Sequence, residues 1–329
     1  MRRSRFVALA AAAGFWPRAG AAAQSDVDPA MTAPVPSLRV LLGPGQVQEL
    51  PGGGFVFEGR TYRGTAMRTP DGQIVNAIGV EQYLYSVVPH EMPPSWPAAA
   101  LAAQAICART YVLQRSNPNR PYDLVPSEAD QVYDGVSGET PSGIAAVEAS
   151  SGQVLRYGGG FARVAYSSCC GGHTEAAADA WGGAGVPYLA GVRCVFCDQS
   201  PNFRWSATIP FETLAGTFAE QLAAVGPMQA LRIDDRDGSG RARNVELVAA
   251  RGSVAVKGSA FRSAVGSRVV RSLLITDVRP SGPAVVLEGG GLGHGVGMCQ
   301  WGARGMALAG RTARDILALY FPGTEIGND

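Results

Sequence analysis

The 329-residue sequence has little net charge and no long apolar run in its main part. Its 28 basic and 27 acidic residues give a formal net charge of +1, which argues against nucleic acid or an anionic membrane surface as a partner. After the N-terminal segment, no stretch reaches the roughly 18 uninterrupted apolar residues of a membrane-spanning helix. We therefore expect a mature chain without a transmembrane segment and a neutral or polar substrate.

Histidines are also scarce, and their scarcity argues against two common kinds of catalytic site. Only His90, His173 and His294 are present. The sequence contains neither the Gly-x-Ser-x-Gly elbow of a serine hydrolase nor the His-Glu-x-x-His motif of a zinc protease. A nucleophilic triad therefore fits this sequence poorly.

The N-terminus has the features of an export signal. Three arginines precede the apolar run from Phe6 to Trp16, and Ala21-Ala22-Ala23 offers a cleavage site. We predict a signal peptide over residues 1–23 and a disordered lead-in over 24–36. Residues 37–329 would form the functional region, as one body or as two intimate lobes that flank a cleft. Sec export is the default, although the paired arginines leave twin-arginine export open; either route leads to the periplasm, the cell envelope or the medium.

Most of the sequence alternates short apolar runs with glycine-rich turns, and a few segments have helical spacing. Strands are predicted over residues 38–42, 54–58, 62–67, 74–78, 152–157 and 161–167, and again within 229–290. Helices are predicted over residues 80–88, 97–114, 211–225, 259–265 and 312–321. This pattern predicts an α+β fold that is rich in strands, with its main helix after Glu91.

Glu91 lies in the most constrained segment of the sequence. His90-Glu91-Met92-Pro93-Pro94-Ser95-Trp96-Pro97 contains three prolines within five residues, and prolines hold a neighbouring catalytic group still by removing backbone freedom. Pro97 also suits the first turn of the helix that follows. Two interpretations stay open at this point: a catalytic carboxylate, or a glutamate that only interacts favourably with a helix dipole.

A second motif is rich in glycine and runs from Gly293 to Ala303. Its alternating glycines allow close approach of the backbone around His294. The glycine spacing is not that of a dinucleotide-binding loop, and no Lys-Ser/Thr follows as in a phosphate-binding loop. His294 is therefore a candidate for either a structural or a site role.

Six cysteines leave three alternatives open. Cys107 is expected to be a buried small apolar residue in a helix. Adjacent Cys169 and Cys170 cannot easily bridge to each other, but each can pair with Cys194 or Cys197 in a disulfide. A closed zinc site is the second alternative and free thiols are the third. The candidate zinc ligands are Cys169, Cys170, His173, Cys194 and Cys197.

Taken together, these segments resemble the SpoIID/LytB family of bacterial cell-wall proteins, which includes stage II sporulation protein D and the amidase enhancers. The matching blocks are residues 80–93, 95–97, 103–105, 108–111, 131–135, 168–175, 181, 186–189, 293–303 and 320–324. They extend over nearly the whole expected mature chain. Their order and spacing make the resemblance specific.

The resemblance implies an exported lytic transglycosylase that cleaves MurNAc-GlcNAc bonds in peptidoglycan glycan strands and leaves 1,6-anhydromuramyl ends. Glu91 takes the position of a single general acid and base, and no cofactor is required for catalysis. Hydrolytic glycosidases usually need two carboxylates; here no second acid shares the motif, although Glu81 and Asp130 are candidates for a nearby position. The acid must be protonated at neutral pH, which calls for a pKa raised by burial or by an apolar neighbour such as Trp96.

The resemblance also implies the other site residues. Arg109 would stabilise charge or position a sugar, and Tyr188 would orient the substrate. The remaining substrate-binding candidates are Gln104, Ser168, His294, Gln300 and Trp301. We expect Glu91, Arg109, Tyr188 and His294 to meet in one open cleft.

Three departures from the family pattern lead to a second hypothesis. Residues 125–130 lack a Cys…His-Cys metal cluster that the family commonly carries there, and alanine stands at positions 102 and 190 where lysine is common. The second hypothesis is a non-catalytic wall-binding protein that stimulates a partner, an N-acetylmuramoyl-L-alanine amidase. Release of 1,6-anhydromuramyl products distinguishes the two.

Overall fold

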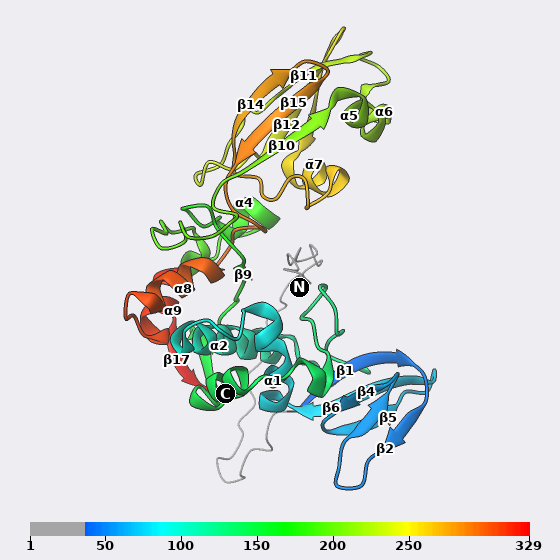
Figure 1. Cartoon of the computed structure of the whole chain (residues 1–329), viewed down its shortest axis with the longest axis vertical. Coiled ribbons are helices and arrows are strands. Elements are labelled where there is room, and N and C mark those ends of the chain that lie inside the picture. The colour runs from blue at the N-terminus through cyan, green and yellow to red at the C-terminus, as the bar shows by residue number, and fades with distance from the viewer. Residues whose placement is uncertain (1–36) are drawn as a thin grey trace.

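The structure is a computed structural model that describes residues 37–329, so the predicted signal peptide and lead-in lie outside the described residues. Helices and short, mostly antiparallel strands in small sheets make up this range, which confirms the predicted α+β class. The molecule is elongated, with the first strands at one end, a second β-rich lobe at the other and most helices between them (Figure 1). Within residues 37–329, no helix has both the length and the apolar character needed to cross a membrane.

Two small antiparallel sheets form the N-terminal end. One has the order β1-β6-β5, with bounds Ser37–Pro44, Gln73–Gly79 and Thr65–Arg68. The other has the order β2-β3-β4, with bounds Val47–Glu49, Phe55–Phe57 and Arg60–Tyr62. The side-chain alternation of β1 buries Leu38 and Val40, and a turn at Asp71-Gly72 joins β5 to β6. Because β6 runs directly into the first helix, this sheet sets where that helix begins.

Three helices form the centre of the main lobe: α1 (Val80–Glu91), α2 (Ala98–Arg115) and α3 (Pro141–Ala149) pack against one another. The longest of the three is α2, which follows Glu91 as predicted and begins directly after its N-cap residue, Pro97. Its small side chains allow the neighbouring helices to approach closely. The alanines of α2 that are fully buried are Ala100, Ala103, Ala105 and Ala108.

Segments from the end of the chain complete this centre. Helices α8 (Gln300–Leu308) and α9 (Ala313–Tyr320) pack on α2. Strand β17 (Glu325–Asn328) pairs with β7 (Gln153–Tyr157), whose other neighbour is β8 (Gly160–Phe161). The short strands β9 (Tyr166–Ser167) and β16 (Met298–Cys299) pair in parallel. The remaining short elements are η1 (Gly135–Gly138), α4 (Ala177–Trp181) and η2 (Pro187–Leu189).

A second lobe, drawn from green to orange at the top of Figure 1, has its own hydrophobic core. One of its sheets is β10-β15-β14, with bounds Trp205–Pro210, Ala284–Gly289 and Ile275–Ser281. The other is β11-β12-β13, with bounds Met228–Arg232, Asn244–Ala249 and Gly252–Lys257. Its helices are α5 (Phe211–Thr217), α6 (Ala219–Leu222) and α7 (Gly258–Val265). Trp205 pairs with Gly289, so the chain enters and leaves this lobe side by side, as an inserted unit does.

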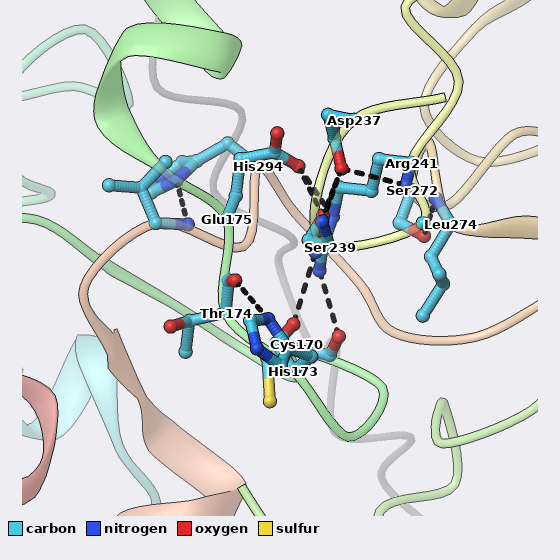
Figure 2. A network of polar contacts seen from close by, with 12 residues as sticks. Cys170, His173, Thr174, Glu175, Asp237, Ser239, Arg241, Ser272, Leu274 and His294 are labelled. Atoms are coloured by element: carbon cyan, nitrogen blue, oxygen red, sulfur yellow. Dashed lines mark hydrogen bonds and ion pairs between the residues drawn. The ribbon is translucent and has the colours of Figure 1, made fainter. Parts of the chain in front are cut away.

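A buried arginine joins the two lobes (Figure 2). Arg241 donates hydrogen bonds to the carbonyls of Cys170 (2.8 Å) and His173 (3.0 Å), and its Nε lies 3.0 Å from the carboxyl of Glu175. Burial, and then the neighbouring carboxyl of Asp237, raise the pKa of Glu175, while the charge of Arg241 opposes this shift. The arginine therefore fixes the second lobe to the segment that follows β9.

Four predicted elements differ from those in the structure. The strand predicted over 62–67 is divided between β4 and β5. The helix predicted over 211–225 is two helices, because the backbone breaks at Phe218, whose ring stacks on Phe261. The strand predicted over 161–167 is divided, because β8 pairs with β7 and β9 pairs with β16. Helix α1 continues past Pro89 to Glu91, which is therefore the last helical residue rather than part of a turn ahead of α2.

Candidate functional site

Glu91 ends α1 and lies almost entirely inside the protein, with an exposed fraction of 7%. The helix closes directly after it, since the backbone N–H of Met92 donates to the carbonyl of Val88 at 3.0 Å. The proline-rich segment then turns the chain into α2. Helix end and prolines together hold the carboxyl in one place.

Two neutral side chains donate hydrogen bonds to the carboxyl of Glu91. The hydroxyl of Tyr166 lies 3.1 Å from Oε1, and Nε2 of Gln300 lies 3.4 Å from Oε2. Burial raises the pKa of Glu91 to about 7, and these two hydrogen bonds oppose part of the shift. The carboxyl is therefore poised to hold or release a proton near neutral pH.

Two further glutamines extend this polar cluster. Nε2 of Gln131 donates to the Tyr166 hydroxyl at 2.8 Å, and Nε2 of Gln300 lies 3.4 Å from Oε1 of Gln104. Gln104 and Gln131 are fully buried. Gln104 and Gln300 are among the site residues predicted from the sequence, whereas Gln131 and Tyr166 are not. Gln131 lies within one of the matching blocks and Tyr166 just before another, and that proximity is the available signal.

Aromatic side chains lie at the entrance to α2. The rings of Trp96 and Trp301 meet edge to face with centroids 5.0 Å apart, and both are half-buried. The guanidinium of Arg304 lies over both rings, 5.1 Å from the Trp301 centroid. The backbone N–H of Trp301 donates to the carbonyl of Ser168 at 3.0 Å. Trp301 and Ser168 are thus neighbours, and the two tryptophans form a partly exposed aromatic surface.

Arg109 lies at the other end of α1. Its Nε is 2.8 Å from the carboxyl of Glu81, and it also donates to the carbonyl of Gln153 at 3.0 Å. Ten residues separate Glu81 from Glu91, which is about 15 Å along a helix. The structure therefore separates Arg109 from Glu91 instead of bringing them together, and uses it to join α1, α2 and β7.

Tyr188 and His294 have separate surroundings of their own. The hydroxyl of Tyr188 accepts a hydrogen bond from the backbone N–H of Arg163 at 2.7 Å, and its ring lies 4.6 Å from that of Tyr157. His294 is half-buried beside Trp181, with ring centroids 5.2 Å apart. Neither hydrogen-bonds to Glu91 in the part of the chain that the structure describes.

His294 is nevertheless connected to the polar cluster through Tyr166. Burial lowers the pKa of His294 to about 4, the charge of Arg241 adds to this, and a hydrogen bond to the backbone of Tyr166 opposes it. The ring is therefore neutral at pH 7, and its Nδ1 accepts from the backbone N–H of Val296 at 2.9 Å. The neighbouring Gly297 has φ 72° and lies where a Cβ would come within 2.1 Å of the Ala165 carbonyl, so the close passage of this loop past β9 requires glycine.

The two carboxylates that sequence analysis considered near Glu91 both have other partners. Glu81 pairs with Arg109 as described. Asp130 lies 3.0 Å from Nε of Arg115 and 3.2 Å from the Tyr111 hydroxyl, and accepts the backbone N–H of Val125. Asp130 thus closes the segment 125–130. Among residues 37–329, Glu91 has no second carboxylate as a hydrogen-bond partner.

Four cysteines come together behind the site. The sulfur atoms of Cys170, Cys194, Cys197 and Cys299 all lie within 4.8 Å of one another, and all four residues are buried. Three of them are among the predicted zinc ligands, and Cys299 is an addition. Cys169 and His173 lie outside this set; Nδ1 of His173 is 2.7 Å from the carbonyl of Thr174.

Two family profiles match separate parts of the chain. The profile described as stage II sporulation protein matches residues 69–157, which contain α1, α2 and α3. A second profile, described as a domain of unknown function (DUF8618), matches residues 195–297 and therefore the second lobe. The first match lies in the main lobe and the second covers the second lobe, and each lobe has its own hydrophobic core.

Similarity to individual proteins extends over most of the chain. An uncharacterized protein of Brachyspira hyodysenteriae is 34% identical over 279 residues, which are 83% of this chain and 74% of the relative. Stage II sporulation protein D of Bacillus subtilis is 28% identical over 274 residues, 77% of this chain and 76% of the relative. The amidase enhancer of Bacillus subtilis is 30% identical over 291 residues, 74% of this chain. That match spans only 40% of the amidase enhancer.

Proposed function

Because the chain belongs to the family of stage II sporulation protein D and the amidase enhancers, we propose that it is an exported peptidoglycan lytic transglycosylase. Glu91 is its single general acid and base. The observation that supports this most strongly is the buried carboxyl with a pKa of about 7 and only neutral hydrogen-bond donors around it. The bond cleaved is the one from MurNAc to GlcNAc.

The proposed reaction uses one carboxyl twice. The protonated Glu91 donates its proton to the glycosidic oxygen as the bond from the muramyl C1 to that oxygen breaks. The resulting carboxylate takes the proton of the muramyl C6 hydroxyl as O6 forms a bond to C1, which closes the 1,6-anhydro ring and restores the acid. A pKa near the working pH favours both steps. Within the described residues Glu91 has no second carboxylate partner, which agrees with a reaction that needs no activated water.

The surrounding side chains supply contacts for a neutral glycan. Nε2 of Gln104 and Oε1 of Gln131 are buried and have no hydrogen-bond partner among the described residues. Buried polar atoms without a partner are uncommon, so each has spare capacity for one further hydrogen bond. Trp96 and Trp301 provide the stacking surface, with Ser168 beside them. In this proposal Gln300 orients Glu91 and His294 supports Tyr166 as a neutral ring.

The test is the product formed from purified glycan strands. We expect the full chain to release 1,6-anhydromuramyl ends, detected by mass spectrometry, and Glu91→Gln to release none. Glu128→Gln, which makes the same exchange at an exposed carboxyl, serves as the control and should retain activity. Circular dichroism checks that both variants fold. Product release by folded Glu91→Gln at the wild-type rate would contradict the proposal.

Similarity to the amidase enhancer supports a second candidate function, a wall-binding protein that stimulates an N-acetylmuramoyl-L-alanine amidase. The alanines at positions 102 and 190 also favour it, since each lines a hollow without contributing charge. The hollow at Ala102, beside Trp96, has a volume of about 180 Å³, and the one at Ala190 about 340 Å³. If this candidate is correct, Glu91→Gln will stimulate a purified amidase as well as the wild type does, and neither protein will produce anhydro ends.

A further inference from the structure

The four-cysteine cluster lies outside the proposed reaction and has the arrangement of a metal site. Its members come from three segments: Cys170 follows β9, Cys194 and Cys197 form a Cys-x-x-Cys loop, and Cys299 ends β16. All four are at most 2% exposed. We propose that these four sulfurs bind one structural zinc ion, which fixes the position of Gln300 beside Glu91.

The distances between the sulfurs fit a tetrahedral ion. With a Zn–S bond of about 2.3 Å, two ligands of a tetrahedral site lie about 3.8 Å apart. The sulfurs of Cys170 and Cys197 are 3.7 Å apart, whereas a disulfide would bring them to about 2.05 Å. The two-residue spacing of Cys194 and Cys197 is also a common one for zinc ligands.

Backbone N–H groups already point at one of the sulfurs. Cys299 Sγ accepts hydrogen bonds from the backbone N–H of Cys170 (3.2 Å) and of Gly302 (3.3 Å). A thiolate bound to a metal is stabilised by such donors, which also orient it. The hydroxyl of Tyr320 lies 3.1 Å from Cys194 Sγ and can act in the same way.

Close packing keeps the Cys-x-x-Cys loop against helix α8. At Gly302 a Cβ would lie 2.7 Å from Cys194 Sγ and 1.9 Å from the Tyr320 hydroxyl, and at Gly305 one would lie 2.0 Å from the Phe196 carbonyl. Only glycine fits at either position. The loop that supplies two ligands is therefore held at the start of the helix that follows the fourth ligand.

The site lies one residue from the polar cluster. Cys299 is the N-cap of α8, where its sulfur accepts the backbone N–H of Gly302, and Gln300 is the first residue of that helix. Zinc bound at Cys299 would therefore hold Gln300 in its position 3.4 Å from Glu91. Because four protein sulfurs fill a tetrahedral shell and exclude water, the ion has a structural role rather than a catalytic one.

Zinc binding releases protons from the four cysteine thiols. One Zn²⁺ and four thiols give a tetrathiolate complex and up to four protons, with no change of oxidation state. Two disulfides, the competing arrangement, would instead need an oxidant to remove four hydrogens. The two arrangements therefore differ in mass as well as in metal content.

Elemental analysis of the purified full chain, produced with zinc in the medium, tests the proposal. We expect about one zinc per chain in the wild type and its loss in Cys194→Ser and Cys299→Ser. Three matched controls should retain it: Cys107→Ser and Cys169→Ser, which remove buried cysteines outside the set, and His173→Ala, which removes a ligand predicted from sequence.

A second measurement covers the case in which the serine variants do not fold. Adding a chelator to the wild type should lower its melting temperature and free four thiols, and Co²⁺ added to the zinc-free protein should give sulfur-to-metal absorption bands. Three results would overturn the proposal: two disulfides with no metal, iron in place of zinc, or zinc that remains in Cys299→Ser and disappears in His173→Ala. None of these readouts depends on the proposed activity.

Discussion

Helix α1 carries a glutamate near each end, and their surroundings differ. Glu81, in the first turn, accepts hydrogen bonds from the guanidinium of Arg109 (2.8 Å) and from the backbone N–H of Gly152 (3.0 Å). Glu91, the last residue of the helix, accepts hydrogen bonds within residues 37–329 only from the neutral side chains of Tyr166 and Gln300. The pairing of Glu81 with the buried guanidinium of Arg109 is an ion pair that joins two helices, which is a structural role. Neutral donors in a buried site leave both the protonated and the charged form of a carboxyl accessible, which suits proton transfer.

Helix α2 produces this contrast because it contacts both ends of α1. Gln104 lies in the polar cluster near Glu91, and Arg109, farther along the same helix, lies at Glu81. The side chain of Arg109 is fully buried, while that of Glu81 is 22% exposed. Helix α2 therefore places the uncharged amide of Gln104 near Glu91 and the charged guanidinium of Arg109 beside Glu81.

The largest effect should come from removing the two carboxylates one at a time. Glu91→Gln should lower the rate of anhydromuramyl product release by about 10²–10⁴-fold, because Gln cannot donate and recover a proton. Glu81→Gln should leave the rate per folded molecule within a few fold of wild type. Single-turnover assays on purified glycan measure both. Equal losses in the two variants would show that Glu91 acts through the fold rather than through its proton.

The same pair should behave in the opposite way in unfolding experiments. Glu81→Gln leaves the buried Arg109 without its counter-charge, and breaking such a pair costs about 3 kcal/mol or more. Urea denaturation of Glu81→Gln should show this loss in the free energy of unfolding, with Glu128→Gln close to wild type. The double variant Glu81→Gln/Arg109→Met should lose less free energy of unfolding than the two single variants lose in sum. If the losses of the two single variants simply add, the interaction between Glu81 and Arg109 does not stabilise the fold.

The raised pKa of Glu91 predicts a pH dependence of stability. The carboxyl has an ordinary pKa of 4.5 and a pKa of about 7 in the folded protein, so between these values the folded state binds more protons than the unfolded state. The free energy of unfolding should therefore fall as pH rises from 4.5 to 7, by about 3 kcal/mol. The free energy of unfolding of Glu91→Gln should lack this fall between pH 4.5 and 7. Parallel stability curves for wild type and variant across this range would refute the raised pKa.

The activity should follow the same titration. Because the proposed reaction begins with the protonated carboxyl, kcat/KM should decline as pH rises through about 7. Tyr166→Phe removes a hydrogen bond that opposes the shift, so this decline should move to higher pH, by up to about one unit. Tyr133→Phe is the matched control, since that hydroxyl donates to Asn76 away from the site. A decline at the same pH in Tyr166→Phe and wild type would exclude the hydrogen bond as a determinant.

The sequence was most informative where function depends on local order. The prolines around Glu91 and the alanine-rich spacing of the next segment predicted a constrained carboxyl and a helix over 97–114, and the structure has α2 over Ala98–Arg115. The α+β class followed from the alternation of strand and helix patterns. These features depend on residues close together in the chain, so spacing alone reveals them.

Partners that lie far apart in the sequence could not be predicted in this way. Nothing near Arg109 indicated that its charge would be met by Glu81, and nothing near Cys299 indicated three other sulfurs from residues 170–197. Tyr166 was missed because its strand has two residues and pairs with β16, whose Met298 lies 132 residues later than Tyr166. Such contacts follow from topology rather than from local periodicity.

The parallel pairing of β9 with β16 also bears on when the site is assembled during folding. Gln300 contacts Glu91 although the two residues are 209 positions apart in the sequence, and contacts of such long range form slowly because a large loop must close first. Ribosomal synthesis delivers α1 and α2 early, whereas α8 arrives only after the entire second lobe has been made. A nascent chain therefore carries Glu91 without Gln300 until the second lobe has been made, so the surroundings of Glu91 are completed only after that lobe.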